Sequence, residues 1–461
     1  MYAPRQIAPK IDDRSNLPVV VLSLWIVASA VFGGYFWALR VPGIFDITIE
    51  RLLFSVILLL LVAGLFQGKV IIQKNIAIEI AMGMFLLVCL LSMTRTGFFP
   101  IIPGLPAPWF NFINGYLFPF FIFVFAKNYH ANEKDVLFIL HTLFYFGIYL
   151  CILSILEFFN LLQFVVPRYI ADPLLGIHMG RARGPFLNAA FNGVGIVIGF
   201  ISGLHLLQKK TGFSRFFYLS ALLLFFPAVF FTLTRAVYLA MLITVIIFLV
   251  WYKTSLPKWK LISLPLVIVL IVGIANYPRL LSTERREGGV YQVKEVAIRF
   301  ALMERSVYLF SGSPFTGIGL AQFVPESILK YRGPVPSFAP ASLATFQHNH
   351  FLGVMTELGL PGILIYLTII IQILRRVKQL KGKLPETGIM GNNLRIVIFA
   401  VWSVFISVAM TAETTNFAFV NAIPMLFAGL ADGLYTRSLQ PGLASPSFVS
   451  QSHMRISRSY V

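Results

Sequence analysis

Long apolar runs, separated by short polar segments, fill most of the chain. A run of about 18 or more residues with few charges is long enough to cross a bilayer as a helix. Such runs predict twelve spans, at residues 17–39, 47–66, 76–94, 109–126, 136–163, 186–207, 216–233, 236–252, 261–277, 351–374, 395–412 and 418–436. The pattern therefore predicts an all-α, polytopic membrane protein.

Composition agrees with this pattern. Only 12% of the 461 residues are charged, whereas soluble domains average about 25%. The first run contains Ala28-Ser29-Ala30, which weakly resembles a signal-peptidase site. Apolar sequence continues to Leu39, however, and predicts an uncleaved first span. The two cysteines, Cys89 and Cys151, lie inside apolar runs and indicate neither a disulfide framework nor a zinc site.

The lysines indicate the orientation of the chain. With a cytoplasmic N-terminus, the inner loops hold 13 of the 15 lysines, and only Lys294 and Lys330 lie outside. Cytoplasmic loops are enriched in cations, so we expect both termini in the cytoplasm. The net charge of +19 lies in loops, and the chain has no soluble basic domain that would bind nucleic acid.

The arginines are distributed differently. Thirteen of the 22 fall on the outer side, where the orienting bias disfavours cations: Arg40, Arg51, Arg95, Arg168, Arg181, Arg183, Arg235, Arg279, Arg285, Arg286, Arg299, Arg305 and Arg332. A guanidinium group is a planar fork of donors that suits phosphate oxygens. This set predicts recognition of a phosphate or carboxylate, and pairing with outer glutamates or lipid headgroups is the alternative.

Five segments follow from these assignments. Residues 1–16 form a cytoplasmic N-terminus, and residues 17–277 hold spans one to nine. Residues 278–346 form a large outer loop, and residues 347–436 hold the last three spans. The tail, 437–461, is rich in Ser and Pro and is expected to be disordered.

The outer loop contains one predicted amphipathic helix. Apolar residues recur there at steps of three and four, at Val293, Val296, Phe300, Met303, Val307 and Phe310. We expect this helix to lie on the membrane-embedded body or to return to it.

Four polar groups on the outer side need an explanation. Arg181 and Arg183 precede a Gly-Pro turn in 181-RARGPFLN-188, and Arg235 interrupts apolar sequence in 232-TLTRAVYLA-240. Arg299 lies on the predicted loop helix, ahead of 314-PFTGIG-319. An arginine near the bilayer is costly unless it faces a polar cavity. Arg235 is therefore a functional candidate, with snorkelling to lipid phosphate as the alternative.

The fourth group opens a span, in 346-FQHNHFLGVMTELGLPG-362. His348 and His350 are two residues apart and would point about 200° from each other on a helix, so only one can face a cavity. His350 and Glu357 are seven residues apart and share a face. A helix cap and a His-x-His metal clip are alternative interpretations of the histidines.

The order of these motifs resembles the bacterial O-antigen ligase / O-antigen polymerase superfamily. The pattern is R-x-x-G-x-F-x-N, then Thr-Arg, then R…P-x-x-G-x-G, then H-N-x-F-L-x-x-x-x-E-x-G-x-x-G. In this chain it corresponds to 181-RARGPFLN-188, 234-TR-235, Arg299 with 314-PFTGIG-319, and 348-HNHFLGVMTELGLPG-362.

The resemblance implies a GT-C-like membrane glycosyltransferase without a cofactor. Such an enzyme moves a glycan from an undecaprenyl-diphosphate carrier to an acceptor glycan or glycolipid, at the periplasmic face of the bacterial inner membrane. Its leaving group is a lipid diphosphate, whose charge outer arginines can stabilise without a metal. The first outer loop, 45-FDITIER-51, lacks the acid pair typical of metal-dependent oligosaccharyltransferases.

The motif match also implies roles for individual residues. His348 takes the role of the family histidine, which deprotonates or orients the acceptor hydroxyl, and an imidazole is a suitable base near neutral pH. Arg235 and either Arg181 or Arg183 would hold the diphosphate, and Arg299 would close the site from the loop. The supporting residues are Asn349, His350 and Glu357.

Other functions remain open at this point. A polymerase would extend the lipid-linked O-antigen or exopolysaccharide chain, whereas a ligase transfers it to an acceptor such as lipopolysaccharide core. Protein glycosylation ranks third, because the outer loop lacks an additional soluble domain. A polysaccharide or small-molecule transporter would place polar residues near the bilayer midplane, whereas here they gather on one side.

Overall fold

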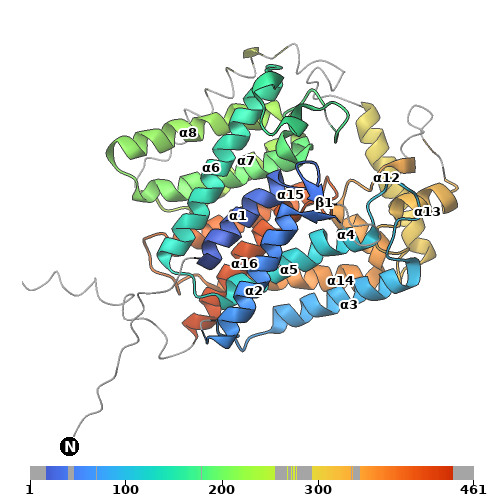
Figure 1. Cartoon of the computed structure of the whole chain (residues 1–461), viewed down its shortest axis with the longest axis horizontal. Coiled ribbons are helices and arrows are strands. Elements are labelled where there is room, and N and C mark those ends of the chain that lie inside the picture. Colours follow the sequence, from blue (N-terminus) through green and yellow to red (C-terminus); the bar gives the residue numbers. More distant parts are fainter. Residues whose placement is uncertain are drawn as a thin grey trace, which may run out of the picture.

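The computed structural model describes residues 17–39, 46–68, 70–177, 179–254, 293–333 and 343–439, together with residue 335 and a few single positions between 267 and 277. Within these residues nearly all regular structure is helical (Figure 1). The exception is one antiparallel pair of two-residue strands, β1 (Ala38–Leu39) and β2 (Ile47–Thr48).

Nine described segments are long and apolar enough to cross a membrane. They are α2 (Ile49–Phe66), α3 (Ala77–Thr96), the segment Pro108–Asn128, α6 (Glu133–Phe158), α7 (Ala189–Leu206), α8 (Gly212–Phe231), α14 (His350–Gln379), α15 (Asn392–Ala409) and α16 (Ala418–Ser438). The segment Pro108–Asn128 consists of α4 (Pro108–Phe112), a π-helical turn (Ile113–Leu117) and α5 (Phe118–Asn128). Two apolar helices are shorter, α1 (Leu17–Val31) and α9 (Arg235–Trp251).

These helices agree with a polytopic membrane protein, and each overlaps one predicted span. The first span differs most from its prediction, because α1 ends at Val31 and not at Leu39. The chain turns at Gly33-Gly34 and enters the strand pair, in which Ala38 pairs with Thr48. The predicted span at 261–277 lies almost wholly outside the described residues, as do residues 1–16 and the tail from 440 onwards.

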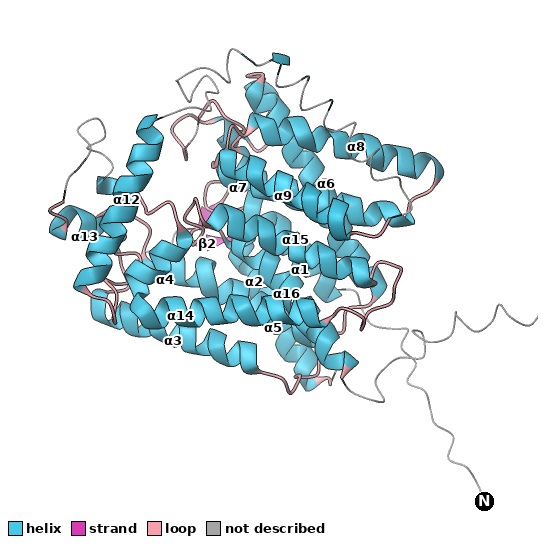
Figure 2. Cartoon of the chain, turned by 180° about the vertical axis from the view of Figure 1, so that it is seen from behind, coloured by secondary structure: helices cyan, strands magenta, loops and turns pink. Residues whose placement is uncertain are grey.

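Two further helices, α12 (Val293–Gly312) and α13 (Phe323–Lys330), belong to the segment expected to form the outer loop. In Figures 1 and 2 they lie at one edge of the molecule, and α8 lies at the opposite edge. Leu302 and Leu309 of α12 pack with Phe323 and Val324 in a small core of their own. The loop helices therefore form a compact addition to the helical bundle.

Glycines let the central helices approach closely. A Cβ at Gly147 of α6 would lie 2.8 Å from the Cα of Gly199 in α7. On α16, Gly429 and Gly433 are four residues apart and face the α5 backbone at Phe123 and Lys127. Small residues at this spacing allow tight helix packing inside a bilayer, where burial of apolar surface between helices gains little.

The helices define two ends of the bundle. At one end, His205 in the last turn of α7 lies 2.9 Å from the hydroxyl of Tyr252, just after α9. There the N–H of Lys253 also donates to Asn393 in the first turn of α15 (3.0 Å). We call this the lysine end, because these lysines lie in or beside it: Lys127, Lys209, Lys210, Lys253, Lys378, Lys381 and Lys383.

A buried ion-pair network fastens the helices near the lysine end. Lys127, in the last turn of α5, is fully buried and pairs with Glu79 of α3 and with Asp432 of α16 (2.9 Å). Arg376 of α14 pairs with the same Asp432 (3.0 Å). Two cations and two carboxylates thus balance in a region where an unpaired charge would be costly.

Candidate functional site

The N-termini of four helices meet at the end opposite the lysines. The ring of Phe191, in the first turn of α7, lies 4.2 Å from that of Phe417, which directly precedes α16. His350, the first residue of α14, lies 3.2 Å from Thr414 in the α15–α16 turn. The start of α9 joins the same group through Arg181, as described below. Helix N-termini carry partial positive charge, so this end favours anions. We call it the site end.

The structure brings two of the predicted arginines together. Arg181 is buried; its Nε donates to the carbonyl of Thr232 (3.1 Å), and its guanidinium also donates to the Thr234 hydroxyl. Thr234 is the N-terminal flank of α9, and exposed Arg235 is the first helical residue. The two guanidinium groups are therefore attached to the same short turn between α8 and α9.

Arg183 has a different environment from Arg181. It is 1% exposed and donates to the carbonyls of Leu175 (2.5 Å), Ile170 (2.7 Å) and Asp172 (2.6 Å). Glu157 of α6 lies 3.9 Å from its Nε. Burial lowers the pKa of Arg183, and the nearby Glu157 carboxylate opposes that shift. These contacts hold the loop before α7 in place, and they engage both terminal nitrogens of the Arg183 guanidinium.

The predicted histidine motif straddles the start of α14. Asn349 is the N-cap, and its side chain accepts a hydrogen bond from the N–H of Leu352 (3.0 Å). His348 precedes the cap in a left-handed conformation, with φ 52°, and is half-buried. His350 is fully buried. The prediction that only one histidine can face a cavity assumed that both residues are helical. In the structure His348 lies outside the helix, so that assumption does not apply to it.

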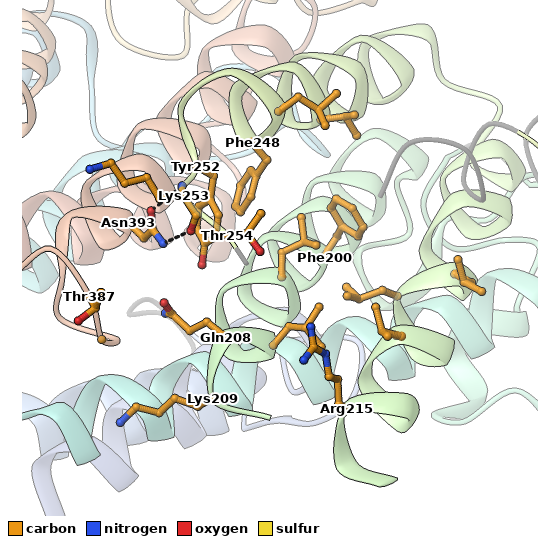
Figure 3. A pocket seen from close by; sticks show the side chains of 18 of the residues that line it. Phe200, Gln208, Lys209, Arg215, Phe248, Tyr252, Lys253, Thr254, Thr387 and Asn393 are labelled. Carbon is orange, nitrogen blue, oxygen red and sulfur yellow. Dashed lines mark hydrogen bonds between the residues drawn. The ribbon is translucent and has the colours of Figure 1, made fainter. Parts of the chain in front are cut away.

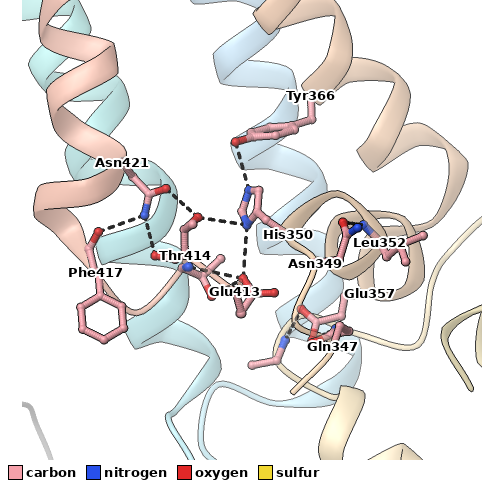
Figure 4. Close-up of polar contacts among 12 residues, drawn as sticks. Gln347, Asn349, His350, Leu352, Glu357, Tyr366, Glu413, Thr414, Phe417 and Asn421 are labelled. Atoms are coloured by element: carbon pink, nitrogen blue, oxygen red, sulfur yellow. Dashed lines mark hydrogen bonds and ion pairs between the residues drawn. The ribbon is translucent and has the colours of Figure 1, made fainter. Parts of the chain in front are cut away.

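His350 belongs to a buried polar network (Figure 4). Its Nδ1 lies 3.2 Å from Glu413 Oε1, and its Nε2 lies 3.0 Å from the Tyr366 hydroxyl. Since an ionised carboxylate only accepts hydrogen bonds, a proton on Nδ1 would pair with Glu413 and leave Nε2 to accept from Tyr366. Thr414 donates to Asn421 (2.8 Å) and presents its oxygen to the same Nδ1. The network thereby joins α14 to the α15–α16 turn.

Glu357 anchors the outer loop to α14. Its carboxylate accepts hydrogen bonds from the N–H groups of Ala321 (2.8 Å) and Phe323 (3.4 Å) and from the Gln347 amide (3.3 Å). Among the described residues, Glu357 makes no hydrogen bond with His350, although the two residues share a predicted helix face. Glu357 thus has the contacts of a residue that orients neighbouring segments.

A kink in α14 receives the Pro/Gly turn of the loop. Gly359 has φ 69° and ψ −168°, which breaks the helix, and Pro361 has no N–H to donate. The carbonyls of Thr356 and Glu357 accept instead from Ile318 (3.0 Å) and Gly319 (2.9 Å). The turn 313–319 therefore replaces hydrogen bonds that α14 has lost.

Arg299 lies on α12, which occupies the range predicted for the amphipathic helix. The buried face of α12 is not the predicted apolar stripe. Four stripe residues are exposed (Val296, Phe300, Met303 and Val307), whereas Leu302, Arg305, Ser306 and Leu309 are buried. Arg299 is also exposed. The Thr356 hydroxyl donates to the Ser306 carbonyl (3.3 Å), so a polar contact helps to select the buried face.

The predicted residues thus form two groups at the site end. One contains Arg181 and Arg235 at the α8–α9 turn, and the other contains Asn349, His350 and Glu357 at the start of α14, next to His348. The N-terminus of α16 lies between them, because Phe417 contacts α7 and Thr414 contacts His350. No hydrogen bond between the two groups is present among the residues that the structure describes.

Sequence analysis missed Glu413 and Tyr366. Glu413 is the only acidic residue between Glu386 and Asp432, and it follows an apolar run. That isolation was a usable signal, since carboxylates are costly at membrane depth. Tyr366 gave no such signal, because tyrosines are frequent in apolar helices of this chain.

A large cavity of the described residues lies at the lysine end (Figure 3). It measures about 610 Å³ and is lined by apolar residues of α7, α8 and α9, including Phe200, Leu222 and Phe248. Polar residues such as Lys209, Arg215 and Lys253 lie at its rim. It is remote from the predicted site residues. The described residues contain no group of three or more His, Cys, Asp or Glu that would hold a metal.

These features define a multi-pass membrane protein whose polar site lies at one end of a helical bundle. Residues 219–367 match the family model described as O-antigen ligase. The match confirms the resemblance found in the motifs and places this part of the chain in the O-antigen ligase superfamily. No curated protein matches the chain.

The matched region covers about a third of the chain and runs from α8 into α14. It includes Arg235, Arg299 and the histidine motif, whereas Arg181 and Arg183 precede it. The family implies a glycosyltransferase-like membrane enzyme that processes lipid-linked glycans.

Proposed function

We propose that the protein transfers a glycan from an undecaprenyl-diphosphate carrier to an acceptor sugar at the periplasmic face of the inner membrane, as an O-antigen ligase does. The observation that carries this proposal is that the predicted site residues cluster at the site end. Arginines on the α8–α9 turn and a histidine motif at the start of α14 flank the N-terminus of α16. This arrangement suits a reaction between an anionic donor and a hydroxyl acceptor.

The arginine side is suited to the donor. In the proposed reaction the bond between the sugar and the diphosphate breaks, and negative charge develops on the leaving group. Arg235 is exposed at the first position of α9, where the helix dipole adds to its charge. Arg181 lies beside it and is held by Thr232 and Thr234. Fixed cations aimed at developing charge stabilise a transition state without a metal.

Arg183 is less suited to binding the diphosphate than Arg181. Three carbonyls and Glu157 already engage its guanidinium. Releasing it would leave Glu157 buried without its cation. We therefore assign diphosphate binding to Arg181 and Arg235 and a loop-stabilising role to Arg183. Arg299, which is exposed on α12, would contact the donor from the loop.

The histidine side is suited to the acceptor. His348 is half-buried and is held outside the helix by the Asn349 cap. His350 is fully engaged by Glu413 and Tyr366, so it is not available to a substrate. We therefore assign the acceptor hydroxyl to His348, which takes up or orients the hydroxyl proton as the oxygen attacks the sugar carbon.

The lysine distribution supports the proposed orientation. The lysine end would face the cytoplasm and the site end the periplasm. A ligase, a polymerase and a transporter would each leave a different glycan product when inactivated, so one experiment can distinguish the three functions.

The test is complementation of a strain that lacks the gene. Wild type, His348→Ala and Arg235→Ala are expressed at matched levels in the membrane, with His141→Ala and Arg215→Ala as controls. The control residues lie toward the lysine end, where His141 contacts Lys210 and Arg215 lines the cavity. Lipid-linked glycan and glycan attached to the outer surface are then measured.

We expect both site variants to accumulate untransferred lipid-linked glycan and to reduce surface glycan at least about 100-fold. The controls should behave like wild type. If the lipid-linked glycan has normal chain length but is not attached to the acceptor, the protein is a ligase. If the glycan chains are short, the protein is a polymerase. Normal surface glycan in both site variants would refute the proposed mechanism, and glycan retained on the cytoplasmic face would indicate transport.

A further inference from the structure

Only one of the two carboxylate oxygens of Glu413, Oε1, contacts polar groups of the described residues. Oε1 lies 3.2 Å from His350 Nδ1 and accepts hydrogen bonds from the Thr415 hydroxyl (2.9 Å) and N–H (3.3 Å). No described residue donates a hydrogen bond to Oε2. The side chain is 13% exposed. One oxygen is thus fixed by the protein, and the other remains able to accept a hydrogen bond.

The second oxygen, Oε2, lies against the backbone at the start of α14. A Cβ built on Gly353 would lie 2.8 Å from Glu413 Oε2 and 3.4 Å from the Gln347 amide nitrogen. A larger residue at position 353 would therefore displace the carboxylate. Gln347 immediately precedes the proposed acceptor histidine, His348, in the chain. Figure 4 shows Glu413, Gln347 and Asn349 around the start of α14.

The charge around Glu413 suits a sugar and opposes a diphosphate. Glu413 and Glu357 border the start of α14, whereas Arg181 and Arg235 lie on the far side of the α16 N-terminus. A carboxylate repels phosphate oxygens. It accepts hydrogen bonds from hydroxyl groups, which sugars present in abundance. The two sides of the site therefore differ in the ligand that they favour.

We propose that Glu413 binds the acceptor sugar, with Oε2 accepting a hydrogen bond from a hydroxyl neighbouring the one that reacts. His350 and Thr415 orient the carboxylate through Oε1, and Tyr366 contacts the other ring nitrogen of His350. This inference rests on the proposed function. It adds an acceptor-binding residue, contributed by the α15–α16 turn, that lies outside the region matched by the family model.

The test uses the full-length protein purified in detergent. The donor is the lipid-linked glycan extracted from the strain that lacks the gene, and the acceptor is the glycolipid fraction of the same strain. KM for each fraction is measured for wild type, Glu413→Gln, Glu413→Asp and Gly353→Ala. Glu386→Gln is the matched control, because Glu386 is an exposed carboxylate at the lysine end that pairs with Lys253.

We expect Glu413→Gln to raise KM for the acceptor fraction at least about tenfold, since a hydrogen bond to a charged group is lost. KM for the donor and the melting temperature should stay as in wild type. Gly353→Ala should act in the same direction by displacing the Glu413 carboxylate, and Glu413→Asp should fall between Glu413→Gln and wild type.

Wild-type kinetics in Glu413→Gln would overturn the inference. So would a loss of kcat and melting temperature at unchanged acceptor KM, which indicates a purely structural carboxylate. In both cases the proposed function stands, because wild type still transfers glycan. If folded wild type transfers none, the proposed function itself fails and this inference fails with it.

Discussion

Three arginines at the site end differ in what surrounds their guanidinium groups. Arg183 is enclosed by carbonyls and Glu157, Arg181 is held by two threonines of the α8–α9 turn, and Arg235 is exposed. Sequence motifs could not choose between Arg181 and Arg183, since both precede the same Gly-Pro turn. Only the folded loop, which brings residues 170–175 around Arg183, separates structural from functional roles.

Replacing Arg183 should therefore affect stability far more than replacing Arg235. Arg183→Ala leaves Glu157 buried and three carbonyls without their donor, which costs about 3–5 kcal/mol. Arg235→Ala at the exposed start of α9 should change the free energy of unfolding by less than about 0.5 kcal/mol. Thermal melting of the purified variants in detergent measures the difference. Equal melting temperatures would mean that the Arg183 contacts contribute little.

At the scale of elements, the kinked helix α14 connects the loop to the proposed site. Its break at Gly359 frees two carbonyls, which accept from the 313–319 turn, while the N–H of Leu360 donates to the Pro314 carbonyl (2.8 Å). The histidine motif lies at the N-terminus of the same helix. The kink thus couples the outer loop to the position of the histidines.

A side chain at Gly359 should disturb this junction. Its Cβ would lie 2.7 Å from the Phe315 carbonyl oxygen and 2.8 Å from the Gly317 nitrogen. Gly388 also has a positive φ, of 94°, but a Cβ there meets nothing within 4 Å. Gly359 also has ψ −168°, a region that is essentially restricted to glycine, so its alanine variant carries backbone strain of about 1–3 kcal/mol in addition to the clash.

We expect Gly359→Ala to lower both the melting temperature and glycan transfer well below the values for Gly388→Ala. Melting curves and the complementation assay provide the two measurements. If the two variants behave alike, the packing of the 313–319 turn against α14 is not important for the site.

Other elements show where sequence prediction succeeds and fails. Hydropathy located the nine membrane-length helices of the described residues, because each is long and apolar enough to stand out alone. It misplaced the buried face of α12: Val296 and Phe300 are exposed, whereas Arg305 and Ser306 are buried. In a membrane protein apolar side chains face lipid as readily as protein, so an apolar stripe does not identify the packed face. Glu413 was missed because its contact with His350 joins residues 63 positions apart.

At the scale of the whole molecule, charge is separated along the bundle. Lysines and the Lys127 ion-pair network lie at one end, and the arginines and helix N-termini of the proposed site lie at the other. We interpret this separation as the sum of two requirements. Under the proposed function, the lysines orient the chain in the membrane, and the arginines would lie outside to bind the diphosphate of the donor.

The most direct test of the proposed function is glycan transfer by the purified protein. Full-length protein is reconstituted into liposomes with lipid-linked glycan and the glycolipid fraction from the strain lacking the gene, in the presence of EDTA. Wild type should attach glycan to the acceptor and release the lipid diphosphate, with the same rate with and without EDTA. Arg235→Ala should be at least about 100-fold slower. Folded wild-type protein that transfers no glycan under these conditions would contradict the proposed function.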